Sequence, residues 1–387
     1  MPQGNSDPKF LMYGRDVTPN HHALAEKYVL LDNFYATGAI SFDGHQWLEQ
    51  GFVSDNVERA LNSHPRGYAW NLADALDVSP AGFIWQHARR PLDVRIGGVL
   101  SLPSKQDPRT QTVVDINEDD LLPWTNYWHL YQEGKWMGAV GSRAAVPALA
   151  KIVDLRYPVN SMRVPDQIRA SVLEQELAEA EKSGHLPDLM VYGLTSDHTM
   201  GTSPGNPTPP AMLADNDFAL GRMVEAISKS SFWSSSLILV VEDDAQNGVD
   251  HVDGHRTVAL AIGPSVKRGA VDSNFYTQLS MARTMQDILH IEPQTHFLKA
   301  ARAMNSIFTP SKDLDTYTAI KPKIAFDTMN PPLHALSGKP LAAARRSAAM
   351  NWNHVDDVPT EVLNQILWWD NKGYDKVMPA SRVTPQH

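Results

Sequence analysis

The 387-residue chain is long enough for one large α/β domain with an appendage, or for two domains, with a sizeable core in either case. Its net charge of −10 and its lack of a lysine- or arginine-rich run exclude a general nucleic-acid-binding protein. Cysteine is absent, which excludes disulfides and thiolate metal sites, and no apolar run is long enough to cross a bilayer. The first residues show no export signal.

Residues 1–19 are polar and rich in turn formers, so we expect an irregular segment there. Asn20 is expected to cap a short helix, and Tyr28–Leu31 to form a strand. The following stretch, Thr37–His45, is predicted to be a tight turn that holds Ser41 between two glycines. Such a serine can present its hydroxyl to a substrate, and a metal can lower that hydroxyl's pKa. Alternatively, Ser41 bonds its own backbone, as turn serines usually do.

The middle of the chain supplies helices and strands around the later motifs. The aromatic-rich stretch Ser101–Tyr157 is either a cap over a site or ordinary aromatic packing. The other elements expected are helix and loop over Ser54–Asp77, a helix start at Gly82–Ala88, a strand at Val94–Leu100 and a helix at Pro165–Ser183 that Gly184 ends.

Leu186–Leu194 is predicted to be a short apolar strand that ends in polar chemistry. Asp197 and His198 follow it, and the prolines of Thr202–Pro210 indicate an ordered loop. Open α/β sheets build their sites at strand carboxyl ends, so Asp197 and His198 are candidate metal ligands. The alternative is a structural Asp–His hydrogen bond.

Ala211–Ser228 is an amphipathic helix that returns the chain to a second apolar strand, Leu237–Val241. This strand is expected to be buried on both faces of a parallel sheet. A loop crowded with possible metal ligands follows it: Glu242, Asp243, Asp244, Asp250, His251, Asp253 and His255. So many carboxylates repel one another unless a cation lies among them, which favours a metal site over a solvated acidic loop or turn caps.

The remaining residues complete the α/β pattern. A further strand is expected at Thr257–Ile262 and a helix at Ser280–His290. From about Lys321 prolines separate two helical segments, near Leu341–Met350 and Thr360–Asn371. The predicted organisation is an irregular segment over 1–19, an α/β domain over 20–325 and a helical C-terminal extension over 326–387.

Several of these motifs together resemble a known family. They are Asn20-His21-His22, Leu31-Asp32-Asn33-Phe34-Tyr35, Ser41-x-Asp43-Gly44-His45, Asp197-His198-Thr199 and the acidic run from Glu242 to Arg256. They resemble the phosphoesterase branch of the alkaline phosphatase superfamily, which includes acid phosphatases and phospholipase C-type enzymes. The likeness covers Asn20–Ile291 and is strongest to bacterial domains that often follow a β-propeller.

The resemblance implies an alkaline phosphatase-like α/β fold, with a central, mostly parallel sheet flanked by helices and a helical C-terminal appendage. It implies that Ser41 is the nucleophile and passes through a phosphoseryl intermediate. His45 and Arg256 would bind phosphoryl oxygens. The metal ligands that it implies are Asp243, Asp244, His251 or His255, His198 and Asp197. The metal would be a divalent ion, with Zn, Mn, Fe and Ca all admissible.

The implied substrate is a small phosphate ester, without nucleic acid or a transmembrane segment, and with an upstream β-propeller as a possible neighbouring domain. The resemblance favours a periplasmic or secreted protein. It departs from the family at the start of the chain, because family members begin with an apolar strand ending in an acidic metal ligand. Nothing before Asn20 provides that strand, so we expect a gap or an unpaired edge in the sheet and impaired activity.

Three functions stay open from the sequence. The first is a metal-dependent phosphomonoesterase or phosphodiesterase. The second is a phospholipase C-like enzyme acting on lipid head groups. The third is a degenerate phosphoesterase domain that keeps the fold and serves as a binding module.

Overall fold

The computed structural model describes residues 12–60, 75–106, 113–244, 255–352 and 357–379. Its helices are α1 (Pro19–Lys27), α2 (Ser41–Gln50), α3 (Asp55–Ala60), α4 (Trp124–Gln132), α5 (Asp166–Ser183), α6 (Pro209–Lys229), α7 (Gln278–Leu289), α8 (His296–Ala300), α9 (Gly338–Ala348) and α10 (Thr360–Lys372). Its strands are β1 (Val29–Leu31), β2 (Phe34–Tyr35), β3 (Val94–Gly97), β4 (Ser101–Gln106), β5 (Val113–Asp115), β6 (Gly141–Ala144), β7 (Leu189–Tyr192), β8 (Ile238–Val241), β9 (Ala259–Ile262), β10 (Ala270–Asp272) and β11 (Tyr276–Thr277).

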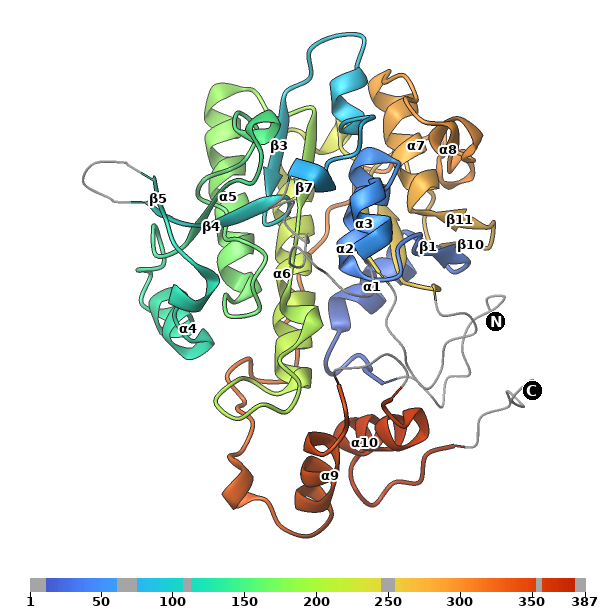
Figure 1. Ribbon diagram of the computed structural model, residues 1–387. Helices are drawn as coiled ribbons and strands as arrows, with labels where there is room; N and C mark the ends of the chain where they lie inside the picture. Colours follow the sequence, from blue (N-terminus) through green and yellow to red (C-terminus); the bar gives the residue numbers. More distant parts are fainter. Residues whose placement is uncertain (1–11, 61–74, 107–112, 245–254, 353–356, 380–387) are drawn as a thin grey trace.

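In Figure 1, β3 and β7 lie between α5 on one side and α2, α3 and α7 on the other, whereas β4 and β5 lie towards one edge of the molecule and β10 and β11 towards the other. The expected α/β fold class is therefore confirmed. Helices α9 and α10 lie together at one end of the molecule, where the sequence predicted two helical segments. Within the described chain, no helix is long and apolar enough to span a membrane.

The central strands form two separate ladders. One has the order β10-β1-β9-β8, and the other is the pair β3-β7. β1 pairs with β10 and β3 with β7 in parallel, but β9 runs antiparallel to both β1 and β8. We expected Leu237–Val241 to lie in a parallel sheet. This expectation is wrong, because β8 pairs antiparallel with its hydrogen-bonded neighbour β9. The side chains of β8 are also only partly buried, whereas those of β9 are fully buried.

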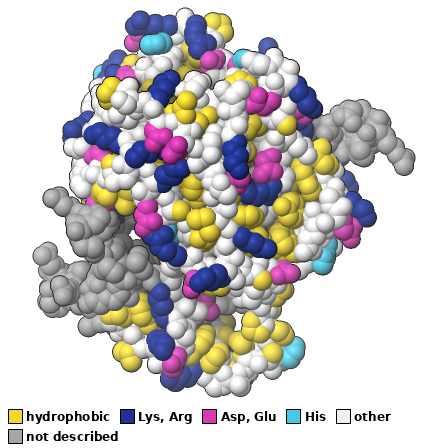
Figure 2. Space-filling model, turned by 180° about the vertical axis from the view of Figure 1, so that it is seen from behind, with side chains coloured by type: hydrophobic (Ala, Val, Ile, Leu, Met, Phe, Trp, Pro, Cys, Tyr) yellow, Lys and Arg dark blue, Asp and Glu magenta, His cyan; other side chains and the backbone are white. Residues whose placement is uncertain are grey.

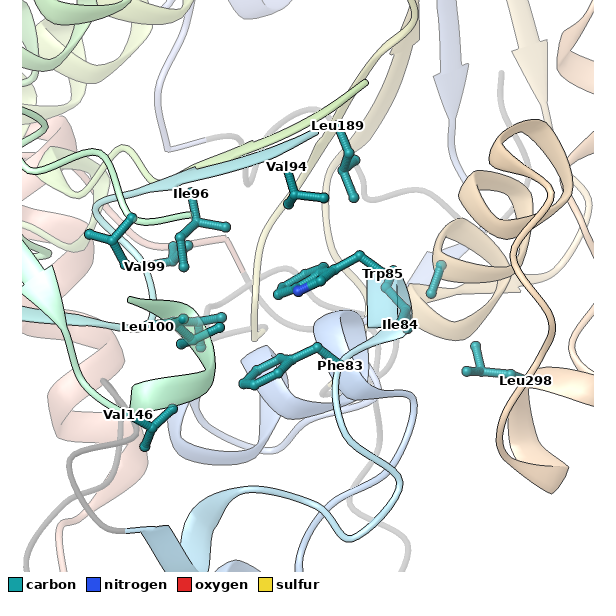
Figure 3. Packing of buried hydrophobic residues seen from close by; sticks show 13 residues of the cluster. Phe83, Ile84, Trp85, Val94, Ile96, Val99, Leu100, Val146, Leu189 and Leu298 are labelled. Atoms are coloured by element: carbon teal, nitrogen blue, oxygen red, sulfur yellow. The ribbon is translucent and has the colours of Figure 1, made fainter. Parts of the chain in front are cut away.

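Apolar side chains cover both faces of β7. Leu189 and Val191 pack in a cluster with Phe83, Trp85 and α7, where the rings of Phe83 and Trp85 stack at 5.0 Å (Figure 3). The intervening Met190 and Tyr192 pack instead with α5 and α6. Because successive side chains of a strand point to opposite faces, β7 has the two-sided apolar character of an internal strand.

Several local predictions agree with the structure and others do not. The helix predicted at Pro165–Ser183 is α5, and Gly184 ends it in the left-handed conformation at φ 72°. Asn20, however, does not cap a helix, because α1 begins at Pro19 and Thr18 precedes it. Asn20 is fully buried and joins three distant parts of the chain. Its amide donates to Asp217 Oδ2 and to the Ile320 oxygen, both at 2.7 Å, and accepts from the Tyr317 hydroxyl at 2.8 Å.

The aromatic-rich stretch forms a small unit of its own. β4 pairs with β5 and β6 in an antiparallel sheet, and α4 carries Trp124 and Trp128, which stack at 5.3 Å. Phe326 packs edge-on against Trp128 at 5.7 Å. Of the two alternatives for this stretch, a cap over a site or ordinary aromatic packing, these contacts correspond to aromatic packing. On the face seen in Figure 2, basic, acidic and apolar side chains are interspersed.

Candidate active site

Ser41 is the first residue of α2 and does not lie in the tight turn that the sequence predicted. The Asp43 carboxylate organises this helix start by accepting hydrogen bonds from the Ala39 and Ile40 backbone nitrogens, each at 3.1 Å. The Ser41 hydroxyl does not bond its own backbone there. It donates to Asp244 Oδ2 at 2.7 Å. A serine at a helix start lies where free N–H groups and the helix dipole favour an anion.

The turn after β8 brings Glu242, Asp243 and Asp244 beside Ser41. Gln278, a fully buried residue of α7, holds this turn by donating to the Asp243 backbone oxygen at 2.5 Å. The same side chain accepts from the Thr37 backbone nitrogen at 2.7 Å, so it also fixes the segment that precedes Ser41. Gly44 completes the contact, because a Cβ atom there would overlap the Asp243 backbone oxygen.

His45 lies one helical turn beyond Ser41, between two carboxylates. Its Nδ1 is 3.2 Å from Glu49 Oε1, and its Nε2 is 3.4 Å from Asp243 Oδ2. Burial alone lowers the pKa of His45, but the charges of Glu49 and Asp243 outweigh burial and raise that pKa to about 9. The pKa of Glu49 is also raised, because burial outweighs the attraction of His45. His45 is therefore a cation at neutral pH, and three nearby carboxyl groups favour its charged form.

The turn after β7, Thr195–His198, holds Asp197 from the other side of the site. The fully buried Asp166 carboxylate accepts from the Thr195 and Ser196 backbone nitrogens, each at 3.0 Å, and pairs with Arg169 at 2.7 Å. A second fully buried carboxylate, Asp215, accepts from the Ser196 hydroxyl at 2.7 Å. This turn is thus fixed by two carboxylates that sequence reasoning missed.

Asp197 and Glu242 meet across the site. Burial raises the pKa of Asp197 to about 6 although a hydrogen bond from Glu242 opposes the rise, and burial and Asp197 raise the pKa of Glu242 well above its usual range. Between these two carboxyl groups the proton is therefore held more readily by Glu242 than by Asp197. Burial and the charge of Asp243 also raise the pKa of Asp244, against the hydrogen bond from Ser41. These shifts show carboxylates crowded in a partly buried place.

Most of the residues expected at the site line one cavity of about 1490 Å³. They are Ser41, His45, Asp197, His198, Asp243, Asp244 and Arg256. Arg256 lines it while donating to the Asp32 backbone oxygen at 2.8 Å. His198 is exposed, and its Nδ1 lies 3.3 Å from the Thr199 oxygen.

The sequence also gave His251 and His255 as alternative metal ligands, and neither is among the residues that line the cavity. His255 is exposed, is not among the residues that line it, and uses its backbone oxygen to accept from Ala36 at 2.6 Å. His251 lies outside the described residues, as do Asp250 and Asp253. Among the side chains that the structure describes, no group of three or more histidines and carboxylates is arranged to hold a metal ion. Asp197, Asp243 and Asp244 converge, but each pairs with a neighbouring protein group.

Sequence reasoning missed Glu49 as a partner of His45 because it expected a turn over this stretch. A helix from Ser41 places residues four apart on one face, so a helical prediction would have found the pair. Asp166, Asp215 and Gln278 gave no such signal, because their partners lie tens to hundreds of residues away.

Comparison with known proteins finds similarity only among solved structures. No protein-family model and no curated protein matches the chain. One similar structure is a protein in the alkaline phosphatase superfamily from Vibrio parahaemolyticus, with 15% identity over 78% of this chain and 67% of that chain and a TM-score of 0.44.

Two enzymes show comparable similarity. One is the phosphonate monoester hydrolase of Agrobacterium radiobacter, with 15% identity over 76% of this chain and 73% of that chain and a TM-score of 0.43. The other is the PsFucS1 sulfatase from Pseudoalteromonas sp., with 12% identity over 79% of this chain and 70% of that chain and a TM-score of 0.42. At these identities and TM-scores the likeness is one of general fold and says nothing about the reaction.

Proposed function

We propose that this protein is a metal-dependent hydrolase of small phosphate esters with Ser41 as its nucleophile. The observation that carries the proposal is the Ser41 hydroxyl, held at the start of a ten-residue helix by a hydrogen bond to Asp244. A nucleophilic hydroxyl needs a neighbouring base, and the raised pKa of Asp244 makes its carboxylate a better proton acceptor. The helix start favours the negative charge of a phosphoryl group.

The donors around Ser41 suit a hard divalent metal by their chemistry. Asp197, Asp243 and Asp244 supply oxygen and His198 supplies nitrogen, which matches the preferences of Zn, Mn, Fe or Ca. When bound, such an ion would neutralise the crowded carboxylates and lower the pKa of the Ser41 hydroxyl. The described donors are paired with protein groups instead, so these bonds, including the one between Asp197 and Glu242, would have to open for the ion to enter.

The residues of the chain would then act as follows. Ser41 attacks phosphorus while its proton passes to Asp244, and the bond between phosphorus and the ester oxygen breaks as the departing alkoxide takes up a proton from water. Asp244 is next to the attacking oxygen, and the positively charged His45 stabilises charge that develops on the phosphoryl oxygens. Water then hydrolyses the phosphoserine and regenerates the hydroxyl. Arg256 lines the same cavity and can orient a phosphoryl group.

Substitution of Ser41 tests this mechanism. Ser41→Ala removes the attacking oxygen, and we expect turnover of p-nitrophenyl phosphate to fall by at least about 10³-fold while the fold is retained. Ser41→Thr keeps a hydroxyl at the same atom and is the matched control, for which we expect part of the activity to remain. The assay is run with added Zn²⁺ or Mn²⁺. Equal turnover in Ser41→Ala and the wild type would contradict the role of Ser41.

A specific observation also favours the second candidate, a binding module without turnover. The described part of the site lacks a three-donor metal group, and a degenerate site would show this arrangement. Inorganic phosphate binding, measured by calorimetry, separates the two functions. A hydrolase both binds phosphate and turns over esters in added metal, whereas a binding module only binds phosphate. Elemental analysis of the wild type and of an Asp243→Ala, Asp244→Ala double variant measures the metal itself.

A further inference from the structure

His21 lines the cavity of the candidate active site but is neither the proposed nucleophile nor a proposed metal ligand. It belongs to α1, and its side chain is 25% exposed. Its Nδ1 lies 2.7 Å from Oδ1 of Asp217, a fully buried residue of α6. The same oxygen accepts from the His21 backbone nitrogen at 2.8 Å. One buried carboxylate therefore holds both the start of α1 and the imidazole ring.

The pairing with Asp217 decides which nitrogen of the His21 ring is available. Asp217 Oδ2 accepts from the Asn20 backbone nitrogen at 3.0 Å and from the Asn20 amide at 2.7 Å, so both carboxylate oxygens act as acceptors. The ring nitrogen that faces such an acceptor carries the proton of the neutral imidazole. Nε2 then has a free lone pair, and among the described residues no hydrogen bond reaches it. An imidazole oriented by a carboxylate in this way is suited to act as a general base.

The next residue, His22, shows a purely structural histidine on the same helix. Its Nδ1 lies 2.7 Å from the backbone oxygen of Thr18, one helical turn earlier, and His22 is not among the residues that line the cavity. The partner of His21 is instead 196 residues away in the sequence. Satisfying the backbone nitrogens at the start of α1 requires only the carboxylate of Asp217 and does not require a ring that borders the cavity.

A row of polar side chains connects α1 to α2. Its members, in order, are His21, Asp217, Asn216, Asp197, Glu242, Asp244 and Ser41. Each member bonds to the next or is its near neighbour in the chain. The Asn216 amide lies 3.4 Å from Asp197 Oδ1, and Ser41 at the far end donates to Asp244. His21 and Ser41 thus stand at the two ends of this row, on different helices, and both line the same cavity.

Hydrolysis of a phosphoserine needs a base that does not come from α2. Water must approach phosphorus on the side opposite to the Ser41 oxygen, because the displacement is in line. His45 lies on the same helix as Ser41, and Asp244 is next to the serine oxygen. The third histidine that lines the cavity, His198, is a proposed metal ligand. His21 is the remaining histidine of the cavity, and it comes from a different helix.

We propose that His21 is the general base that activates water for hydrolysis of the phosphoserine, with Asp217 as its positioning residue. A bond forms between the water oxygen and phosphorus while Nε2 takes one proton from that water. The bond between phosphorus and Ser41 Oγ breaks, and the serine oxygen takes back the proton that Asp244 accepted. His21 then releases its proton to solvent. The inference rests on the proposed function, because this water attacks the phosphoserine that Ser41 forms.

Replacement of His21 tests the proposal by separating the two steps of the reaction. His21→Ala removes Nε2 but leaves Ser41, so the phosphoserine should still form while its hydrolysis slows. We expect steady-state turnover of p-nitrophenyl phosphate in added Mn²⁺ to fall by about 10²–10⁴-fold. A rapid burst of p-nitrophenol should remain, and intact-mass spectrometry after an acid quench should show one added phosphoryl group. If His21→Ala unfolds, His21→Gln takes its place, because its amide can still donate to Asp217 but cannot accept a proton from water.

Free imidazole distinguishes a base from a structural residue. In His21→Ala it can enter the space that the ring leaves, and we expect it to discharge the phosphoserine and to restore part of the turnover. His22→Ala is the matched control, for which we expect wild-type turnover, no accumulated phosphoserine and no response to imidazole. Asp217→Asn offers an amide in place of one acceptor and disturbs the ring, so we expect it to keep the burst and to accumulate phosphoserine as well.

Four results would overturn the proposal. Wild-type turnover in His21→Ala would remove the role of His21 while leaving Ser41 as the nucleophile. Loss of the burst in His21→Ala, or phosphoserine that imidazole fails to discharge, would show that the ring does not act on the water. Equal accumulation in His22→Ala would assign the effect to α1 as a whole. A wild type that turns over no ester in added metal would overturn both this inference and the proposed function.

Discussion

The two turns that meet at the candidate site carry similar carboxylates but are held in different ways. Two buried carboxyl groups fix the turn after β7, where Asp166 and Asp215 accept hydrogen bonds from residues of the turn. A neutral amide fixes the turn after β8, where Gln278 donates to the Asp243 oxygen and Gly44 allows close approach. Loss of the partners of a buried charge costs more free energy than loss of the partners of a neutral amide. The first turn should therefore be rigid and sensitive to substitution, and the second more tolerant.

The largest effect is expected from Asp166→Ala. This change removes the acceptor of two backbone nitrogens and leaves the fully buried Arg169 without its charge partner. Breaking a buried pair in this way should lower the free energy of unfolding by about 3–5 kcal/mol. Urea denaturation measures it. Asp188→Ala breaks the surface pair with Arg90 and serves as the control, with a loss of less than about 1 kcal/mol. Similar losses in both variants would contradict the comparison.

The next effect tests His45 through pH. Its pKa rises from 6.5 unfolded to about 9 folded, so its contribution to stability is complete below pH 6.5 and is lost as pH rises through 9. At about 1.4 kcal/mol per pKa unit, the contribution is at most roughly 3 kcal/mol. We expect the difference in unfolding free energy between the wild type and His45→Gln to shrink between pH 6.5 and 9.5, measured in EDTA. A difference that stays constant over this range would show that His45 is not charged in the folded protein.

Gly44→Ala tests the close approach at the second turn. The added methyl group overlaps the Asp243 backbone oxygen, so the turn or α2 must shift. Overpacking of this kind should cost about 1–3 kcal/mol, and it should separate Ser41 from Asp244 and lower any turnover more than it lowers stability. Gly14→Ala is the control, because a Cβ atom there meets nothing within 4 Å. Unchanged activity in Gly44→Ala would show that the turn after β8 adapts without affecting Ser41.

The smallest effect is expected from Gln278→Leu. Leucine keeps the size of the side chain but removes the bonds to Thr37 and Asp243, which should cost about 1–2 kcal/mol. Thermal unfolding measures the loss, and Gln132→Leu at an exposed helix end is the control. If Gln278→Leu destabilised the protein as much as Asp166→Ala, the difference between the two turns would disappear.

Local patterns predicted much of the fold. The helix that became α5 has a proline before its first residue and a left-handed glycine after its last, and both are visible in the sequence. The strands before Asp197 and Asp243 were found because apolar runs stop abruptly at charged residues. The antiparallel direction of β9 could not be predicted, because strand order depends on pairings between distant segments.

The residues of the candidate site also separate into those that the sequence predicted and those that it could not predict. Ser41, Asp197, Asp243 and Asp244 were predicted from motifs, and the structure brings them to one cavity. His255, which the resemblance gave as an alternative to His251, is exposed and is not among the residues that line this cavity, and its role as a ligand stays a prediction. The residues that hold the site in place, Asp166, Asp215 and Gln278, act through backbone groups, which leave no trace in residue type.

The buried amide of Asn20 has a consequence for how the chain is made. Its partners Asp217 and Ile320 are 197 and 300 residues away, so the ribosome must synthesise most of the protein before this amide can be satisfied. Until then α1 cannot dock without burying an unpaired polar group, and contacts at such sequence separation form slowly. Helix α1 is therefore expected to be among the last elements to settle, and a chaperone that holds this helix until Ile320 has been synthesised should increase the yield of folded protein.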